Sequence, residues 1–243
     1  MLIYRFAMSV CCGMIIPFAG AHADAPEERV LFADDFQRQE SEPHLEQVGN
    51  GWGTNSRARA KGNKQVDLAD GAMHITRHAE ADHGVSVTQD VAFRDATIQM
   101  RFKIGPKDDL GINIADMQEK SVHAGHLCMA RIRTNQIEIT DLKTGKMNLE
   151  LRKRRLEKTS DDADAKLVAQ KSKRTKVQLA ADQWHDLAVT IAGDEMTVSI
   201  DGKKVDSFAS PGIAHATKRR LRLAVGRDAW VDDVRITTPD PAK

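Results

Sequence analysis

Hydrophobic and polar residues alternate with a period of two along most of the chain. The clearest run is residues 96–104, where an apolar residue follows each polar one for nine positions. This period puts every second side chain on one buried face, which is typical of a β-strand and not of a helix. The pattern predicts strands at 30–36, 65–68, 73–77, 85–93, 96–104, 110–115, 127–133, 137–142, 187–192, 196–200, 221–225 and 231–237.

Turn signals separate these strands at short intervals. Asp70-Gly71, Gly105-Pro106, Gly193-Asp194 and Asp201-Gly202 each stand between two apolar runs, and such dipeptides favour tight turns. Many short strands with little helix indicate two antiparallel sheets packed face to face. We therefore predict an all-β sandwich in which one domain covers residues 24–238.

One segment departs from the alternation. Residues 149–176 are rich in Lys and Arg, include four consecutive basic residues at Arg152–Arg155, and carry Asp161-Asp162-Ala163-Asp164 in the middle. We predict a charged, partly helical insertion on one side of the sandwich. The final residues 239–243 are polar and Pro-rich, and we expect them to be disordered.

The first 23 residues have the composition of a secretory signal peptide. Arg5 is followed by an uncharged, mostly apolar run to Gly20 and then by the small-x-small site Ala21-His22-Ala23. The apolar run is shorter than the roughly 20 residues that a membrane-spanning helix needs. We expect cleavage after Ala23, a location outside the cell or in the periplasm, and no membrane span after cleavage.

Charge and cysteine content further limit the kinds of partner and of scaffold that this chain can have. The chain has 36 basic and 35 acidic residues and a single Tyr, so neither net charge nor aromatic content favours a nucleic-acid partner. Cys11 and Cys12 lie in the signal segment, which leaves Cys128 alone and excludes an internal disulfide. The hydrophobic core must therefore hold the domain together.

A family resemblance rests on three segments. Trp184–Ile191, with the hairpin that ends at Asp201-Gly202, is similar to the late hairpin of concanavalin A-like and laminin G-like domains. Asp34-Asp35-Phe36 resembles their opening strand, and 231–236 resembles their closing strand. The resemblance implies a two-sheet jelly roll of the concanavalin A-like type. Among its members, the chain looks most like exported 3-keto-disaccharide hydrolase domains.

One motif of the related family 16 glycoside hydrolases is missing. Those enzymes carry Glu-x-Asp-x-x-Glu on one strand, and the nearest match here, Glu138-Ile139-Thr140-Asp141, has a different spacing. Residues three apart on a strand face opposite sides, so no catalytic carboxylate pair is carried over. Fold alone does not establish activity.

Two His-bearing loops are the first candidate ligand site. One contains His123, His126 and Cys128, and the other is Pro211–Lys218, which contains His215. On an uninterrupted strand, His126 and Cys128 would face the same side, which leaves open a zinc or thiol site. The alternative is an inert, buried Cys128. We predict that His123, His126, His215 and Lys218 line one carbohydrate-binding pocket.

Trp52 and four aspartates are further candidates. Trp52 lies in the Gly-rich loop 49–53 and is the best candidate for an exposed Trp that stacks on a sugar ring; the alternative is burial, which is the norm for Trp. Trp184 begins an apolar strand and is expected in the core. Asp34, Asp35, Asp232 and Asp233 lie on the first and last strands, where four carboxylates would suit Ca²⁺. The alternative is edge charge that discourages aggregation.

Three functions remain open from the sequence. The first is an exported glycan-binding domain, and the basic clusters 152–155, 171–176 and 218–222 extend it to anionic glycans; these clusters are otherwise a solvated basic surface. The second is a glycoside hydrolase of the 3-keto-disaccharide hydrolase-like type, and the third is a structural protein of the cell envelope. We place binding first because no acid pair can be named for hydrolysis.

Overall fold

The computed structural model describes residues 28–239, so the predicted signal peptide and residues 240–243 lie outside the described part. Three helices and one 3₁₀ turn are present: α1 (Ser56–Arg59), α2 (Leu149–Leu156), α3 (Asp162–Gln170) and η1 (His123–Gly125). The strands are β1 (Glu28–Asp34), β2 (Gly53–Thr54), β3 (Val66–Ala69), β4 (Ala72–Thr76), β5 (Val85–Phe93), β6 (Ala96–Lys103), β7 (Leu110–Ala115), β8 (His126–Arg133), β9 (Gln136–Asp141), β10 (Ser172–Lys176), β11 (His185–Ala192), β12 (Glu195–Ile200), β13 (Lys203–Ala209), β14 (Lys218–Val225) and β15 (Asp228–Pro239).

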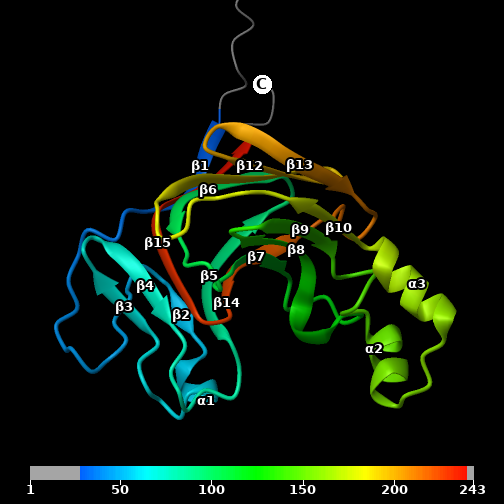
Figure 1. The fold of residues 1–243 in the computed structure, drawn as a ribbon, viewed down its shortest axis with the longest axis horizontal. Coiled ribbons are helices and arrows are strands. Elements are labelled where there is room, and N and C mark those ends of the chain that lie inside the picture. The colour runs from blue at the N-terminus through cyan, green and yellow to red at the C-terminus, as the bar shows by residue number, and fades with distance from the viewer. Residues whose placement is uncertain (1–27, 240–243) are drawn as a thin grey trace, which may run out of the picture.

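The strands form two antiparallel sheets that pack face to face, as the alternation predicts. Sheet A has the order β13-β12-β11-β6-β15-β4-β3, with β1 also paired to β15. Sheet B has the order β10-β9-β8-β7-β14-β5-β2. Figure 1 shows sheet A above sheet B, with sheet B curved so that its free face forms the underside of an arch. This architecture confirms the predicted all-β jelly-roll sandwich.

The first and last strands are neighbours. β1 pairs antiparallel with β15, and Asp34 lies opposite Val234. Pro239 lies opposite Glu28 and is part of β15, so at this position the prediction of a disordered tail is wrong. The pairing brings the two aspartate pairs of the sequence to the same end of the sandwich.

The core is the layer between the two sheets, and each strand contributes alternate residues to it. In β9, Ile137 and Ile139 are buried in the core, whereas Glu138 and Thr140 point to the free face of sheet B. In β14, Leu221 and Leu223 are likewise in the core. Burying these apolar side chains provides the main stabilisation, at roughly 25 cal/mol per Å² of apolar surface.

The basic segment 149–176 forms α2, α3 and β10. Asn148 caps α2 by accepting hydrogen bonds from the amides of Glu150 and Leu151, and Asp161 caps α3 by accepting one from Asp164 N. β10 then pairs with β9 and extends sheet B by one strand. The two helices form one side of the arch, and α1 with β3 and β4 forms the other (Figure 1).

No helix among residues 28–239 combines the length and the apolar character that a membrane span requires.

Candidate functional site

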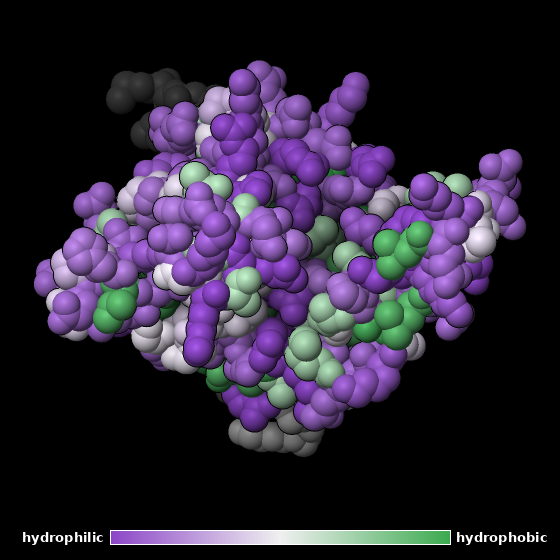
Figure 2. Space-filling model, turned by 90° about the horizontal axis from the view of Figure 1, so that it is seen from below, coloured by the Kyte–Doolittle hydropathy of each residue, from purple (hydrophilic) through white to green (hydrophobic). Residues whose placement is uncertain are grey.

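A cleft of about 700 Å³ lies on the free face of sheet B. Its floor comes from β5, β7, β8 and β14, and its walls come from α1 and from the 142–155 segment. Hydrophilic side chains cover most of this underside in Figure 2. The polar lining side chains are Thr54, Asn55, Arg59, His83, Ser86, Thr88, Asn113, His123, His126, Arg131, Lys146, Arg152, Arg155, Arg220 and Arg222.

Three of these side chains meet at the centre of the floor. His126 Nδ1 lies 3.0 Å from Asn113 Oδ1, and Arg222 Nη1 lies 3.1 Å from His126 Nε2. Arg222 Nη1 also lies 3.0 Å from Nδ1. Asn113 Oδ1 can accept a proton from Nδ1, and the guanidinium of Arg222 can donate to the ring nitrogen that carries none. The ring of His123 lies 6.5 Å from that of His126.

A β-bulge turns His126 toward the cleft. The pairing of β7 with β8 shifts register between Ile114 and Ala115, and Ala115 lies opposite His126. The extra residue breaks the alternation, so His126 lines the cleft while Cys128 is fully buried in the core. The expectation that His126 and Cys128 face the same side is therefore wrong, and burial raises the pKa of Cys128 to about 12. These positions favour the inert Cys128.

Cations dominate the cleft. Among residues 28–239, no aspartate or glutamate lines it. Three of its arginines are paired with carboxylates: Arg59 with Asp82, Arg131 with Asp109 and Arg220 with Asp90. Four other lining cations have no carboxylate partner within the described part of the chain: Arg222, Lys146, Arg152 and Arg155.

Burial shifts the pKa values of several cleft groups. Loss of water, followed by the charge of Arg222, lowers the pKa of His126 to about 3, so its imidazole is neutral at pH 7. Loss of water also lowers the pKa values of Arg222 and Lys146. The cleft thus combines a neutral base with desolvated, unpaired positive charge, a state that an anionic ligand would stabilise.

Glu138 on β9 is another carboxylate on this face of sheet B. It accepts a hydrogen bond of 2.9 Å from Nε of Arg174 on the neighbouring β10. Asp141, three residues on, is fully buried and accepts hydrogen bonds from the amides of Thr144 and Gly212 and from the hydroxyls of Thr144 and Ser210. Both carboxylates are occupied by partners within the protein.

His215 belongs to a charged network beside the cleft. Its Nδ1 lies 2.8 Å from Lys143 Nζ, and its Nε2 lies 3.5 Å from Asp116 Oδ2. The amide of Asp116 donates to the carbonyl of Gly125, so Asp116 connects the two His-bearing loops. However, the side chain of His215 points to this network, whereas His123 and His126 line the cleft.

Lys218 is fully buried, in contrast to the prediction that it contacts ligand. Its Nζ donates to the carbonyl oxygens of Arg94 and His215 at 2.7 and 2.8 Å. The register of β14 against β5 shifts between Lys218 and Arg220, and this bulge turns Lys218 inward while Arg220 stays on the cleft face. Lys218 therefore holds the 210–217 loop and does not line the cleft.

Trp52 is also buried, with 9% of its surface exposed, so it is not the exposed stacking platform for which it was a candidate. Its indole Nε1 donates to Asp34 Oδ2 at 2.8 Å, and its ring packs edge-on against Phe32. The buried carboxylate offers the indole N–H a partner, which makes burial of the large ring favourable. Trp184 lies under the side chains of Arg101 and Lys103 and is partly exposed, so its expected place in the core is wrong as well.

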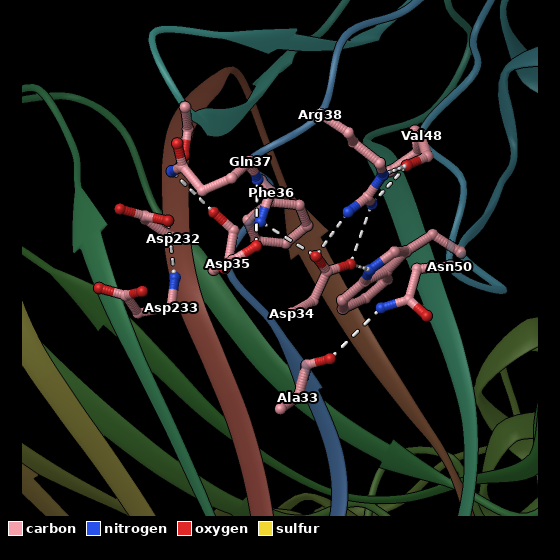
Figure 3. Close-up of polar contacts among 12 residues, drawn as sticks. Ala33, Asp34, Asp35, Phe36, Gln37, Arg38, Val48, Asn50, Asp232 and Asp233 are labelled. Atoms are coloured by element: carbon pink, nitrogen blue, oxygen red, sulfur yellow. Dashed lines mark hydrogen bonds and ion pairs between the residues drawn. The ribbon is translucent and has the colours of Figure 1, made fainter.

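The four aspartates lie at one end of the sandwich, as Figure 3 shows, but they do not form a calcium site. Asp34 is bound by both terminal nitrogens of Arg38, at 2.6 and 2.9 Å, and Asp232 lies 3.2 Å from Arg101. Within residues 28–239, no group of three or more His, Cys, Asp or Glu side chains is arranged to hold a metal ion. The prediction of calcium is corrected because arginines supply the positive charge there.

Asn113, Lys146 and Arg222 were missed as individual site residues. The alternation contained a signal for Arg222, because buried Leu221 and Leu223 place Arg220 and Arg222 on the opposite face. Asn113 lies in an apolar run with no such signal. Lys146 follows a turn, and only the folded chain brings it to the cleft wall.

Comparison with known protein families shows the family to which this chain belongs. The model of the 3-keto-alpha-glucoside-1,2-lyase-like domain matches residues 46–237, which is well over half of the chain. The chain belongs to this family. The match spans every strand from β2 to β14 and most of β15, and so includes all parts of the cleft. A comparison with curated protein sequences finds no match.

Solved structures with the same fold include carbohydrate-active proteins. A family 16 endo-β-1,3(4)-glucanase, SCLam, has a TM-score of 0.57 at 14% identity and covers 89% of this chain and 95% of its own. An endo-β-1,3-glucanase from Pyrococcus furiosus has a TM-score of 0.54 at 12% identity, with coverages of 90% and 97%. The carbohydrate-binding module CBM66 from Bacillus subtilis has a TM-score of 0.50 at 10% identity, with coverages of 77% and 96%. At these identities the likeness establishes the concanavalin A-like fold.

Proposed function

We propose that the cleft on sheet B binds a carbohydrate that carries an anionic group. The observation that carries the proposal is the set of four lining cations without carboxylate partners, in a cleft that no described acidic residue lines. Family membership and the carbohydrate-active structures of the same fold support a sugar as the ligand. This places carbohydrate binding ahead of a structural role in the envelope.

The physical argument is one of charge and desolvation. Arg222 and Lys146 have lost part of their hydration, which lowers their pKa values, and an unpaired cation in such a place is costly. A carboxylate or sulfate on the sugar would supply the missing counter-charge. The planar guanidinium of Arg222 is suited to donate hydrogen bonds to such a group. Asn113, Thr88 and Ser86 offer hydrogen bonds to sugar hydroxyls.

The test compares two oligosaccharides of equal length, one of uronic acid and one neutral, by isothermal titration calorimetry. We expect the acidic ligand to bind at least about 10-fold more tightly and the difference to shrink as salt is added. Arg222→Gln should remove most of the difference, and Arg29→Gln, which changes an exposed arginine on β1, should leave it unchanged. Equal binding of the two ligands, independent of salt, contradicts the proposal.

A second candidate is cleavage of the sugar at the same site, supported by the family match and by the neutral His126 beside Arg222. Hydrolysis by two carboxylates finds no such pair among the described residues that line the cleft. The arrangement instead favours removal of a proton next to a carbonyl group, the first step of an elimination. The test is incubation with a 3-keto disaccharide, and product formation that His126→Asn abolishes would support it.

We also propose that the protein is exported to the periplasm or beyond. The support is the basic start, the apolar run and the small-residue site at Ala21-His22-Ala23. Mass spectrometry of protein recovered from the producing cells should give a chain that begins at Asp24. Recovery of a chain that retains Met1 contradicts the proposal.

A further inference from the structure

We propose that the cleft cleaves uronic acid-containing glycans by β-elimination, with His126 as the base and Arg222 as the group that binds the uronate carboxylate. The inference rests on the proposed function, because it takes the anionic carbohydrate of this cleft as substrate. It adds the substrate class and the reaction. In the substrate, the carboxylate stands on the carbon whose proton is removed, so one cation can both bind the sugar and promote the reaction.

His126 meets the geometric requirements of a base. In the tautomer that the proposal requires, Nδ1–H donates to Asn113 Oδ1, 3.0 Å away, which fixes the ring and leaves Nε2 unprotonated. The ring is on the floor of the cleft and is only partly exposed, because the bulge opposite Ala115 turns it out of the core. The nearby charge of Arg222 weakens this base in the free protein. A substrate carboxylate that pairs with Arg222 would neutralise this charge and make the imidazole a stronger base.

Arg222 stands where the substrate carboxylate is needed. Its Nη1 contacts both ring nitrogens of His126, at 3.0 and 3.1 Å. Its Nη2 lies 3.4 Å from the carbonyl oxygen of Ala124. No carboxylate of the described chain pairs with it, so no negative charge of the described chain competes with the carboxylate of a ligand. Transfer of this guanidinium from Nε2 to the substrate would release the lone pair of His126 next to the C5 proton.

The elimination balances without an added oxidant or metal. Nε2 of His126 removes the C5 proton, and the electrons of that C–H bond pass into the carboxylate, whose second negative charge Arg222 stabilises. These electrons then return to form the C4=C5 double bond as the C4–O glycosidic bond breaks. The leaving oxygen takes the proton from the protonated His126, and the products are a new chain end and an unsaturated uronate.

The charge of the cleft favours a uronate over a neutral keto sugar. A neutral ketone would leave the cation of Arg222 without a full counter-charge, and it would give no role to the cations on the wall. Arg152 and Arg155 from α2 line the same cleft, and so does Lys146. They provide a place for the carboxylate of the neighbouring uronate in an oligomer.

The experiment uses oligomers of galacturonate, glucuronate, mannuronate and guluronate, followed by ultraviolet absorbance of the C4=C5 double bond and by mass spectrometry. At least one should yield an unsaturated product, which is one water lighter than the product of hydrolysis. His126→Asn should lower kcat by about 10²-fold or more, with Kd for the oligomer changed less than threefold. His44→Asn, an exposed histidine away from the cleft, should leave kcat unchanged.

The outcomes separate this inference from the proposed function. Tight binding of the acidic oligomers without any unsaturated product from the four overturns the elimination and leaves the binding proposal in place. Absence of binding overturns both. Saturated products, or cleavage of a 3-keto disaccharide with none of the uronates, assign another reaction or substrate class. If Arg222→Gln does not fold, Arg222→Lys tests the same group, and we expect it to raise KM.

Discussion

Nη1 of Arg222 lies 3.1 Å from Nε2 of His126, although 96 residues separate them in the chain. The contact exists because sheet B has the order β8-β7-β14, so both side chains lie on its free face with only β7 between them. Asn113 on β7, the strand between them, contacts Nδ1 of His126. Three neighbouring strands thus give one rigid constellation, which is the arrangement that a preorganised site requires.

The first prediction concerns the stability of the protein in acid. The native pKa of His126 is about 3, below the ordinary 6.5, so the unfolded chain binds a proton at pH values where the native protein does not. The free energy of unfolding should therefore be highest above pH 6.5. It should fall by a few kcal/mol in total as the pH decreases toward 3. Urea unfolding at pH 7 and pH 4.5 should show this loss, and His126→Gln should reduce it. An identical loss in the variant contradicts the assignment.

The second prediction concerns Glu119, which belongs to the charged network around His215 beside the cleft. Hydrogen bonds from Ser121, together with the nearby Lys143, lower the pKa of Glu119 from 4.5 to about 2. A depressed carboxyl pKa stabilises the fold above pH 4.5, and this contribution disappears as the pH falls to 2, by about 1–3 kcal/mol. Glu119→Gln should therefore be less stable than the parent at pH 7 but nearly equal to it at pH 2.5, as measured by urea unfolding. A constant difference at both pH values excludes the ionised carboxylate of Glu119 as the source of the stabilisation.

The third prediction concerns Asp141, which joins the ends of two loops beside the cleft. Its carboxylate accepts four hydrogen bonds, from the amides of Thr144 and Gly212 and the hydroxyls of Thr144 and Ser210. Asp141→Ala leaves buried donors without acceptors and should cost about 3 kcal/mol or more of unfolding free energy. Asp186→Ala, at an exposed aspartate on β11, is the matched control and should change stability by less than about 0.5 kcal/mol.

The fourth prediction concerns Cys128. Complete burial raises the pKa of this thiol to about 12, so the reactive thiolate is scarce and inaccessible in the native protein. In a chain with Cys11 and Cys12 changed to Ser, a thiol reagent should label Cys128 only after unfolding by urea. Fast labelling under native conditions, with loss of carbohydrate binding, would instead place this thiol in the site.

Many elements of the fold could be predicted from the alternation alone. The residues of β6, β11, β12 and β14 repeat with period two, and all four are strands with one core face. β10 was included in the charged insertion because it has little apolar character, and its pairing with β9 stabilises it as a strand. β13 was missed because its buried face is incomplete.

The sequence by itself determined the all-β class, the apolar layer and the presence of histidines and basic residues in the connecting segments. A period of two is a local property of the extended backbone, so it can be read without knowing the partners of a strand. The tertiary structure decided which of those polar residues form the site. Bulges at His126 and after Lys218 reverse the faces that alternation implies, and strand order brings Arg222 to His126. Both depend on hydrogen bonds between strands distant in the chain, which no local pattern contains.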